Sequence, residues 1–188
     1  MTLPFPVPTL TTARLTLRPP AEADFAAMLA YNDSPRLRHA GGRRDRQSVW
    51  RALLANIGHW ALRGYGLYSV DDRAGEFIGR VGVVFHDDWP EAELGWHLFD
   101  GAEGKGYAQE AALAARADYH ARITAAPVIS MIDPDNARSI ALAGRLGAQF
   151  ERTGLLGDKP YGVYRHPAPV AALSGLATHR HFALPEGT

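Results

Sequence analysis

Hydrophobic residues recur along the chain with two different periods, and the period changes from segment to segment. Residues 14–18 alternate between apolar and polar, which predicts a strand that ends at two prolines. From residue 21 to about 32, and again from about 49 to 63, apolar residues recur every three or four positions, which predicts two amphipathic helices. The chain therefore begins with a strand followed by two helices.

The rest of the pattern predicts a mixed α/β protein. Residues 66–70 and 77–85 flank a turn-forming segment and indicate a hairpin, and residues 93–99 continue the antiparallel run. An alanine-rich helix over 106–121, a strand over 128–132, a helix over 137–146 and strands near Phe150 and Val163 follow. We expect a mostly antiparallel central sheet of about seven strands, flanked by about four helices.

Length and charge narrow the function classes. A chain of 188 residues fits one domain. We place this domain at residues 1–166, followed by a proline-containing C-terminal tail at 167–188 whose role we do not assign. Twenty basic and twenty acidic side chains cancel, so the composition favours neither nucleic acid nor an acidic membrane surface as a partner. We expect a monomer or a homodimer.

The absence of cysteine and the composition of the first ten residues indicate in which cellular compartment the protein works. The chain has no cysteine, which excludes disulfides and thiolate nucleophiles and fits a reducing compartment. The first ten residues contain three prolines and no basic cluster, unlike a signal peptide. No apolar run approaches the ~20 residues of a membrane span. We therefore expect a cytoplasmic protein.

Two segments offer further candidate contacts. Five arginines crowd residues 36–46 together with His39, which indicates either a solvated basic loop or a substrate-binding segment. Trp89, in the segment before residues 93–99, is the best aromatic candidate for an acceptor pocket. His39, His86 and His97 lack the spacing of a zinc site, so we expect no metal.

The segment from Gly101 to Tyr107 indicates an anion-binding loop. It follows a predicted strand and opens a helix, and glycines at 101, 104 and 106 let the backbone turn sharply and approach a ligand. The first amides of the helix lack internal partners, and the helix dipole favours phosphate. The spacing is not that of a Walker loop, because Lys105 is followed by Gly106 rather than Ser or Thr, nor that of a dinucleotide fingerprint.

A second motif begins at Asn136, between a predicted strand and a predicted helix. Asn136 and Ser139 stand where polar side chains commonly cap a helix and bond its first turn. On local chemistry alone, capping is a sufficient explanation of both residues.

Together the two motifs resemble those of the GNAT family of acyl-CoA N-acyltransferases. The family's loop is usually Arg/Gln-x-x-Gly-x-Gly/Ala, which Gly106 and Ala108 match and Glu103 does not. Its second pattern is Asn-x-x-Ser before a helix that ends in Leu-Gly, as at Asn136, Ser139 and residues 146–147. The order of predicted elements over residues 9–166 is also that of the GNAT fold, and the chain looks like the branch of ribosomal-protein N-terminal acetyltransferases (RimJ/RimL-like).

The resemblance implies a co-substrate and a set of site residues. Acetyl-CoA would be the acyl donor. Asn136 would contact the pantetheine amides and the Ser139 hydroxyl would lie near the sulfur, with Tyr164 as an alternative donor. Main-chain amides near residues 97–99 would polarise the thioester oxygen. The implied acetyl-CoA-binding residues are His97, Leu98, Phe99, Gly104, Lys105, Gly106, Tyr107, Ala108, Asn136 and Ser139.

Glu93 is the candidate general base. The family's base often lies on this strand, where a carboxylate can reach an amine directly or through one water. The alternative is that Glu93 is an exposed strand carboxylate outside the site. The resulting hypothesis is an N-acetyltransferase that transfers acetyl to a primary amine, on a peptide or protein N-terminus or on a small molecule.

Two other functions stay open at this point. Glu103 in the loop leaves room for an acyl-CoA-binding or sensing domain without turnover. A regulatory module that binds another phosphate ligand in the same loop is the third hypothesis.

Overall fold

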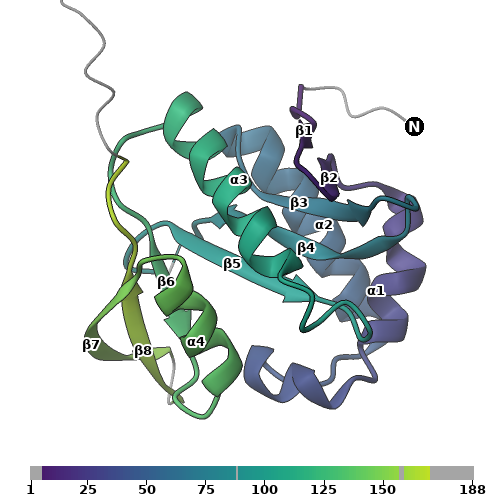
Figure 1. Ribbon diagram of the computed structural model, residues 1–188. Helices are drawn as coiled ribbons and strands as arrows, with labels where there is room; N and C mark the ends of the chain where they lie inside the picture. Colours follow the sequence, from purple (N-terminus) through teal and green to yellow (C-terminus); the bar gives the residue numbers. More distant parts are fainter. Residues whose placement is uncertain (1–5, 88, 157–158, 170–188) are drawn as a thin grey trace, which may run out of the picture.

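One eight-stranded sheet runs through the part of the chain that the computed structural model describes, residues 6–87, 89–156 and 159–169 (Figure 1). Its strand order is β1-β2-β3-β4-β5-β6-β8-β7, and every neighbouring pair is antiparallel except β5 and β6. The strands are β1 (Leu10–Thr11), β2 (Leu15–Arg18), β3 (Leu67–Asp72), β4 (Phe77–Val84), β5 (Glu93–Leu98), β6 (Ile129–Ile132), β7 (Gln149–Leu156) and β8 (Lys159–Arg165). The predicted mixed, mostly antiparallel sheet is confirmed, with β1 as an additional short strand.

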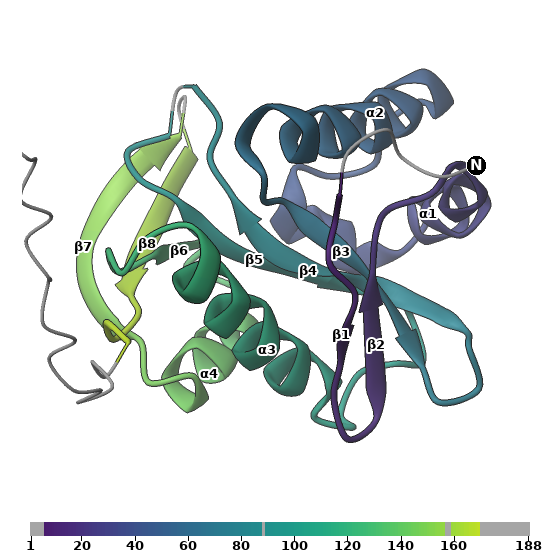
Figure 2. The ribbon, with the colours of Figure 1, turned by 90° about the horizontal axis from the view of Figure 1, so that it is seen from above.

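Four α-helices cover the two faces of the sheet. They are α1 (Phe25–Tyr31), α2 (Arg46–Arg63), α3 (Tyr107–Arg122) and α4 (Ala137–Arg145). Figure 2 shows α1 and α2 on one face and α3 and α4 on the other. The four predicted helices are confirmed, and none of the described helices is long and apolar enough to cross a membrane.

Two short 3₁₀ helices add to the predicted elements, η1 (Glu22–Asp24) before α1 and η2 (Pro35–Ala40) between α1 and α2. The predicted basic loop is thus partly helical. Ser34 starts η2 by accepting a hydrogen bond from the Arg36 amide, Pro35 occupies its first turn, and Gly41 ends it with φ 91°.

Alternation along β5 separates two environments. Leu94 and Leu98 are buried on the α3 face, in the main core, where Ala111, Ala112 and Ala115 let α3 lie close to the sheet. Residues 93, 95 and 97 point to the opposite face, toward α1 and α2. The sheet therefore has an apolar face under α3 and a partly polar face under α1.

β5 and β6 pair only at Glu93 and Ile129 and then diverge, opening the sheet (Figure 1). We call the space between them beyond this pair the fork. The Phe99 amide donates to Ile78 O at 2.8 Å, so main-chain groups of the odd-numbered residues of β5 face β4. The main-chain N–H and C=O groups of Trp96 and Leu98 consequently face the fork, where no neighbouring strand pairs with them.

The predicted domain boundary stays a prediction. Residues 170–188, most of the expected tail, lie outside the described residues.

Candidate active site

The anion-binding loop lies between β5 and α3, at the open end of the fork. Gly101, Gly104 and Gly106 adopt φ of 86°, 75° and 79°, a left-handed conformation that favours glycine. Gly106 is the N-cap of α3 and supplies no side chain to cap it, so the amides of the first turn keep their capacity to bind an anion. This backbone geometry suits an anion, and the binding of pyrophosphate here stays a prediction.

The β1–β2 hairpin fixes the start of α3. The Glu110 carboxylate, in the first turn, accepts hydrogen bonds from Thr12 Oγ1 at 2.6 Å and from Arg14 Nε at 2.7 Å. Arg14 Nη1 also donates to Lys105 O at 2.8 Å, and its guanidinium lies 4.9 Å from the centre of the Tyr107 ring. Arg14 is therefore a cation beside the loop that the sequence motifs did not identify, because it comes from a distant hairpin.

Glu103, where the family usually has Arg or Gln, lies close to the loop's own amides. Its pKa is lowered, chiefly by a hydrogen bond from its own main-chain amide, with Arg36, the Gly101 amide and Arg138 contributing. Arg36 Nη1 lies 3.5 Å from Glu103 Oε1, and the Glu103 side chain is 39% exposed. The carboxylate is thus an internal competitor for groups that would bind phosphate.

Glu93 lies at the closed end of the fork. Its Oε1 accepts a hydrogen bond from the Met131 amide of β6 at 3.1 Å. Burial raises the pKa of Glu93 to about 8, opposed by that hydrogen bond. Glu93 is thus half-buried between two strands, and a pKa in this range suits a base that works near neutral pH.

Asn136 and Ser139 lie at the start of α4, on the other face of the sheet. Asn136 is the N-cap of α4, and its Oδ1 accepts a hydrogen bond from the Ser139 amide at 3.2 Å. The predicted capping role therefore accounts for this oxygen of Asn136. The Ser139 hydroxyl oxygen accepts a hydrogen bond from Trp96 Nε1 at 3.1 Å. An oxygen that accepts in this way can still donate its own proton.

The main-chain amides of residues 97–99, which were predicted to polarise the thioester oxygen, point in two different directions. The Phe99 amide is already engaged with Ile78 O, and the alternation directs the His97 amide toward β4 as well. The Leu98 amide faces the fork, and so does that of Trp96, which the sequence did not nominate. The proposed Tyr164 packs against Phe150 with ring centres 5.6 Å apart.

The basic segment links the two sides of the fork. Arg36 Nη1 donates to Phe99 O at 3.4 Å and lies 3.5 Å from Asp100 Oδ1. At the other end of η2, His39 Nδ1 lies 2.9 Å from Asp133 Oδ2, before α4, and this contact is the main reason that the pKa of Asp133 is lowered. η2 therefore holds positions on both sides of the fork.

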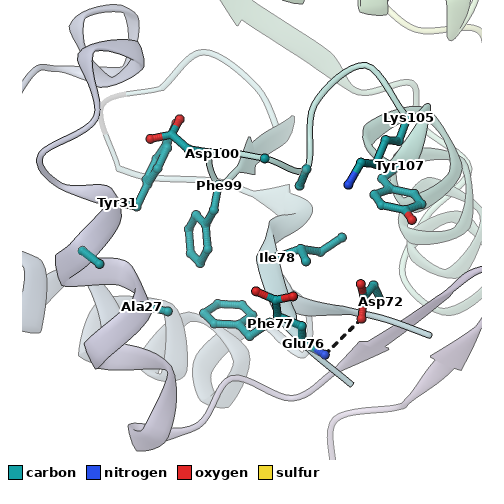
Figure 3. A pocket seen from close by; sticks show the side chains of 13 residues that line it. Ala27, Tyr31, Asp72, Glu76, Phe77, Ile78, Phe99, Asp100, Lys105 and Tyr107 are labelled. Carbon is teal, nitrogen blue, oxygen red and sulfur yellow. Dashed lines mark hydrogen bonds between the residues drawn. The ribbon is translucent and has the colours of Figure 1, made fainter. Parts of the chain in front are cut away.

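A separate cleft of about 480 Å³ lies on the outer side of the loop (Figure 3). Phe77, Ile78 and Phe99 line it, with Tyr31 and Asp100 on one side and Lys105 and Tyr107 on the other. Neither Glu93 nor Ser139 lines this cleft, so it is distinct from the fork. The described residues contain no group of three or more His, Asp or Glu side chains that could hold a metal ion.

Residues 14–149 match the family model of the acetyltransferase (GNAT) domain. The chain belongs to the GNAT acetyltransferase family. The chain is 30% identical over 162 residues to an uncharacterized protein, YkkB, of Bacillus subtilis, covering 82% of this chain and 93% of that protein.

Solved structures of GNAT proteins are also similar to this chain. The acetyltransferase from Agrobacterium tumefaciens is 37% identical, with a TM-score of 0.80, covering 89% of this chain and 98% of that one. The ribosomal L7/L12 N-acetyltransferase RimL, solved with coenzyme A, shares the fold at 19% identity and a TM-score of 0.62, covering 82% and 93%.

These comparisons confirm the predicted family and the GNAT fold, which RimL shares. The protein is a GNAT acetyltransferase with acetyl-CoA as its co-substrate. The acceptor does not follow from the family, because GNAT structures of this fold include enzymes for ribosomal protein and for aminoglycosides.

Proposed function

We propose that the protein transfers the acetyl group of acetyl-CoA directly to a primary amine, on a peptide or protein N-terminus or on a small molecule. The observation that supports this most is the arrangement of the fork. Glu93 and Ser139 flank it from opposite faces of the sheet, and the anion-binding loop lies at its open end. A base, a donor and a phosphate site thus meet along one path.

Each group has a role in this reaction. Glu93 takes the proton of the amine as its nitrogen attacks the thioester carbonyl carbon. The Leu98 or Trp96 amide donates to the oxygen on which negative charge develops. As the carbon–sulfur bond breaks, the Ser139 hydroxyl donates a hydrogen bond to the leaving thiolate, which then takes up a proton.

The remaining predicted site residues bind and position acetyl-CoA. The amides of residues 104–108 hold the pyrophosphate, with Lys105 and Arg14 supplying positive charge. The unpaired edge of β5 at Trp96 and Leu98 suits the amides of an extended pantetheine chain, and Asn136 lies across the fork from it. Positioning the two reactants together is worth up to about 7–11 kcal/mol in well-oriented systems.

Release of CoA thiol from acetyl-CoA in the presence of a panel of primary amines tests the proposal. Because the chain contains no cysteine, every thiol detected comes from CoA. We expect thiol release that depends on the amine. Acetyl-CoA binding without any amine-dependent release would instead support the sensing function, and tighter binding of ATP or NAD in calorimetry would contradict the proposed donor.

The phosphate loop has its own test. Gly106→Val places a side chain at φ 79° and within 3.4 Å of Arg14 Nη2, so we expect loss of acetyl-CoA binding. Gly58→Val is the matched control, since a Cβ at Gly58 on α2 meets nothing within 4 Å. Unchanged affinity in folded Gly106→Val would contradict the assignment of the loop.

A further inference from the structure

A row of polar residues crosses the face of the sheet beneath α1. The strand register places Arg18 of β2 opposite Ser69 of β3, Ser69 opposite Arg80 of β4, and Arg80 opposite His97 of β5. Cross-strand partners point to the same face of a sheet. His97 is two residues from Gly95 and four from Glu93, on the same face of β5. The row therefore leads to the side of the fork where Glu93 lies.

One half of the row is neutralised. Arg18 donates to both oxygens of Asp24 at 2.7 and 3.1 Å. The same carboxylate accepts from Ser69 Oγ at 2.6 Å and from the Ala21 amide at 2.9 Å. Asp24 thus has four donors and little capacity left for a further cation.

The other half of the row keeps a cation without an ion pair among the described residues. Arg80 Nε is buried and has no hydrogen-bond partner, and no carboxylate of the described residues forms an ion pair with this guanidinium. Burial lowers the pKa of Arg80 to about 10, so it stays charged at neutral pH. Burial, with Arg80 and Arg44 nearby, lowers the pKa of His97 to about 3, so His97 is neutral.

Retaining such a charge costs stability unless something else balances it. The surroundings balance it only in part. Asp24 attracts Arg80 electrostatically but is already hydrogen-bonded to Arg18, Arg44 repels Arg80, and the Tyr31 hydroxyl, whose pKa is raised, is neutral at pH 7. A half-buried cation whose buried Nε has no hydrogen-bond partner is a feature expected where an anionic ligand supplies the missing charge.

Space for a ligand lies beside this cation. Gly95 stands on the same face between Glu93 and His97, and a Cβ added there would meet no atom within 4 Å. Its φ does not require glycine, since it is absent from the positive-φ glycines. The bare backbone at Gly95 therefore leaves open room between the base and the Arg80–His97 pair.

We propose that the acceptor is a small amine that also carries a carboxylate, and that Arg80 binds this carboxylate while the amine lies over Gly95, within reach of Glu93. The carboxylate accepts hydrogen bonds from the guanidinium, and His97 offers a neutral donor next to it. Because Arg80 is recessed at the sheet beneath α1, a compact amino carboxylate fits better than a long chain. This assignment rests on the proposed acetyl transfer.

Matched acceptors test the proposal. The common α-amino acids and their C-terminal amides present the α-amine with and without the carboxylate. The amide lowers the pKa of the amine, so kcat/KM is compared per concentration of unprotonated amine. For wild type we expect kcat/KM to favour the acids by about 10- to 100-fold, the usual value of a charge-assisted hydrogen bond. Amine-dependent turnover without this preference would overturn the inference while leaving acetyl transfer intact, whereas no turnover with any amine would overturn the proposed function.

Two variants of Arg80 test whether this residue causes the preference for acceptors with a carboxylate. Arg80→Met should remove the preference, mainly through KM for the acid, and leave turnover of the amides and the Kd of acetyl-CoA unchanged. Arg80→Lys keeps the charge and should restore part of the preference, which a merely structural role would not produce. Arg51→Met, on the exposed face of α2, is the control and should behave as wild type.

Three results would contradict the assignment. They are an unchanged preference in folded Arg80→Met, an equal loss of acetyl-CoA affinity in that variant, and better turnover of peptides than of free amino acids by the wild type.

Discussion

Burial gives Glu93 a pKa of about 8, so at pH 7 only about one carboxyl in ten is ionised. A base must be deprotonated to accept the proton of the amine, and kcat/KM should therefore rise with pH between about 7 and 8. Glu93→Gln should lower turnover by about 10- to 100-fold and remove this rise, with little change in the Kd of acetyl-CoA.

The measurement is a pH profile with an amine of low pKa, so that titration of the acceptor does not produce the same limb. An identical profile in Glu93→Gln would exclude Glu93 as the base.

The Glu103 carboxylate lies near amides that would bind phosphate, and like charges repel. Glu103→Gln should therefore lower the Kd of acetyl-CoA several-fold and make the Kd rise more steeply with salt, because the attraction by the loop's cations is no longer opposed. Calorimetry at two salt concentrations measures both effects. Glu22→Gln, an exposed carboxylate on η1, serves as the control. Equal affinities of Glu103→Gln and wild type would mean that the carboxylate turns away when the phosphate binds.

At the level of elements, the β1–β2 hairpin and α3 depend on each other through Glu110. Burial raises the pKa of Glu110, but Thr12 and Arg14 outweigh it and the net shift is downward. The folded state thus binds this proton less tightly than the unfolded state. The stabilisation is present above about pH 4.5 and is lost as the pH falls through the lower folded pKa.

Glu110→Gln should cost about 1 kcal/mol at pH 7, after allowing for partial exposure, and the cost should vanish in acid. Urea denaturation at pH 7 and at pH 3 measures this difference. A several-fold weaker affinity for acetyl-CoA should accompany it, because Arg14 no longer holds the Lys105 carbonyl. A stability loss that is equal at both pH values would contradict the ionic contribution.

Elements with long, regular periods were predictable from the sequence, and short or aperiodic ones were not. The helix over 106–121 and the strand over 93–99 correspond closely to α3 and β5. β1 has only two residues, too few to show alternation, and η2 lies in an arginine-rich segment without any apolar period.

The residues of the site were predictable where they are close together in the sequence, and not where strand pairing brings them together. The loop and the Asn136 motif are local in sequence, so spacing identified them. Arg80 lies in a predominantly apolar strand, and its place beside His97 depends on the register of β4 and β5. Register between distant strands is a property of the folded sheet, which one strand's sequence does not specify.

For the whole molecule, Arg80 should be a cost to stability. Arg80→Met removes a buried charge that has no partner and keeps a side chain of similar length, so we expect the Tm to rise by a few degrees. About 1 kcal/mol corresponds to roughly 2–4 °C in a chain of this size. Differential scanning calorimetry of wild type and variant, without substrates, measures it. A lower Tm would show that Arg80 supports the fold.

The opposite placement of Glu93 and Ser139 also has a kinetic consequence. An amine that approaches from the α1 face and a thiol that leaves toward α4 do not compete for the same space. Both substrates can then be bound at once, and no acetylated enzyme need form between them. Initial velocities measured at several concentrations of each substrate should give intersecting double-reciprocal lines. A single molecule joining the amine to CoA through the acetyl carbons should inhibit competitively against both substrates, whereas parallel lines would require a covalent enzyme intermediate.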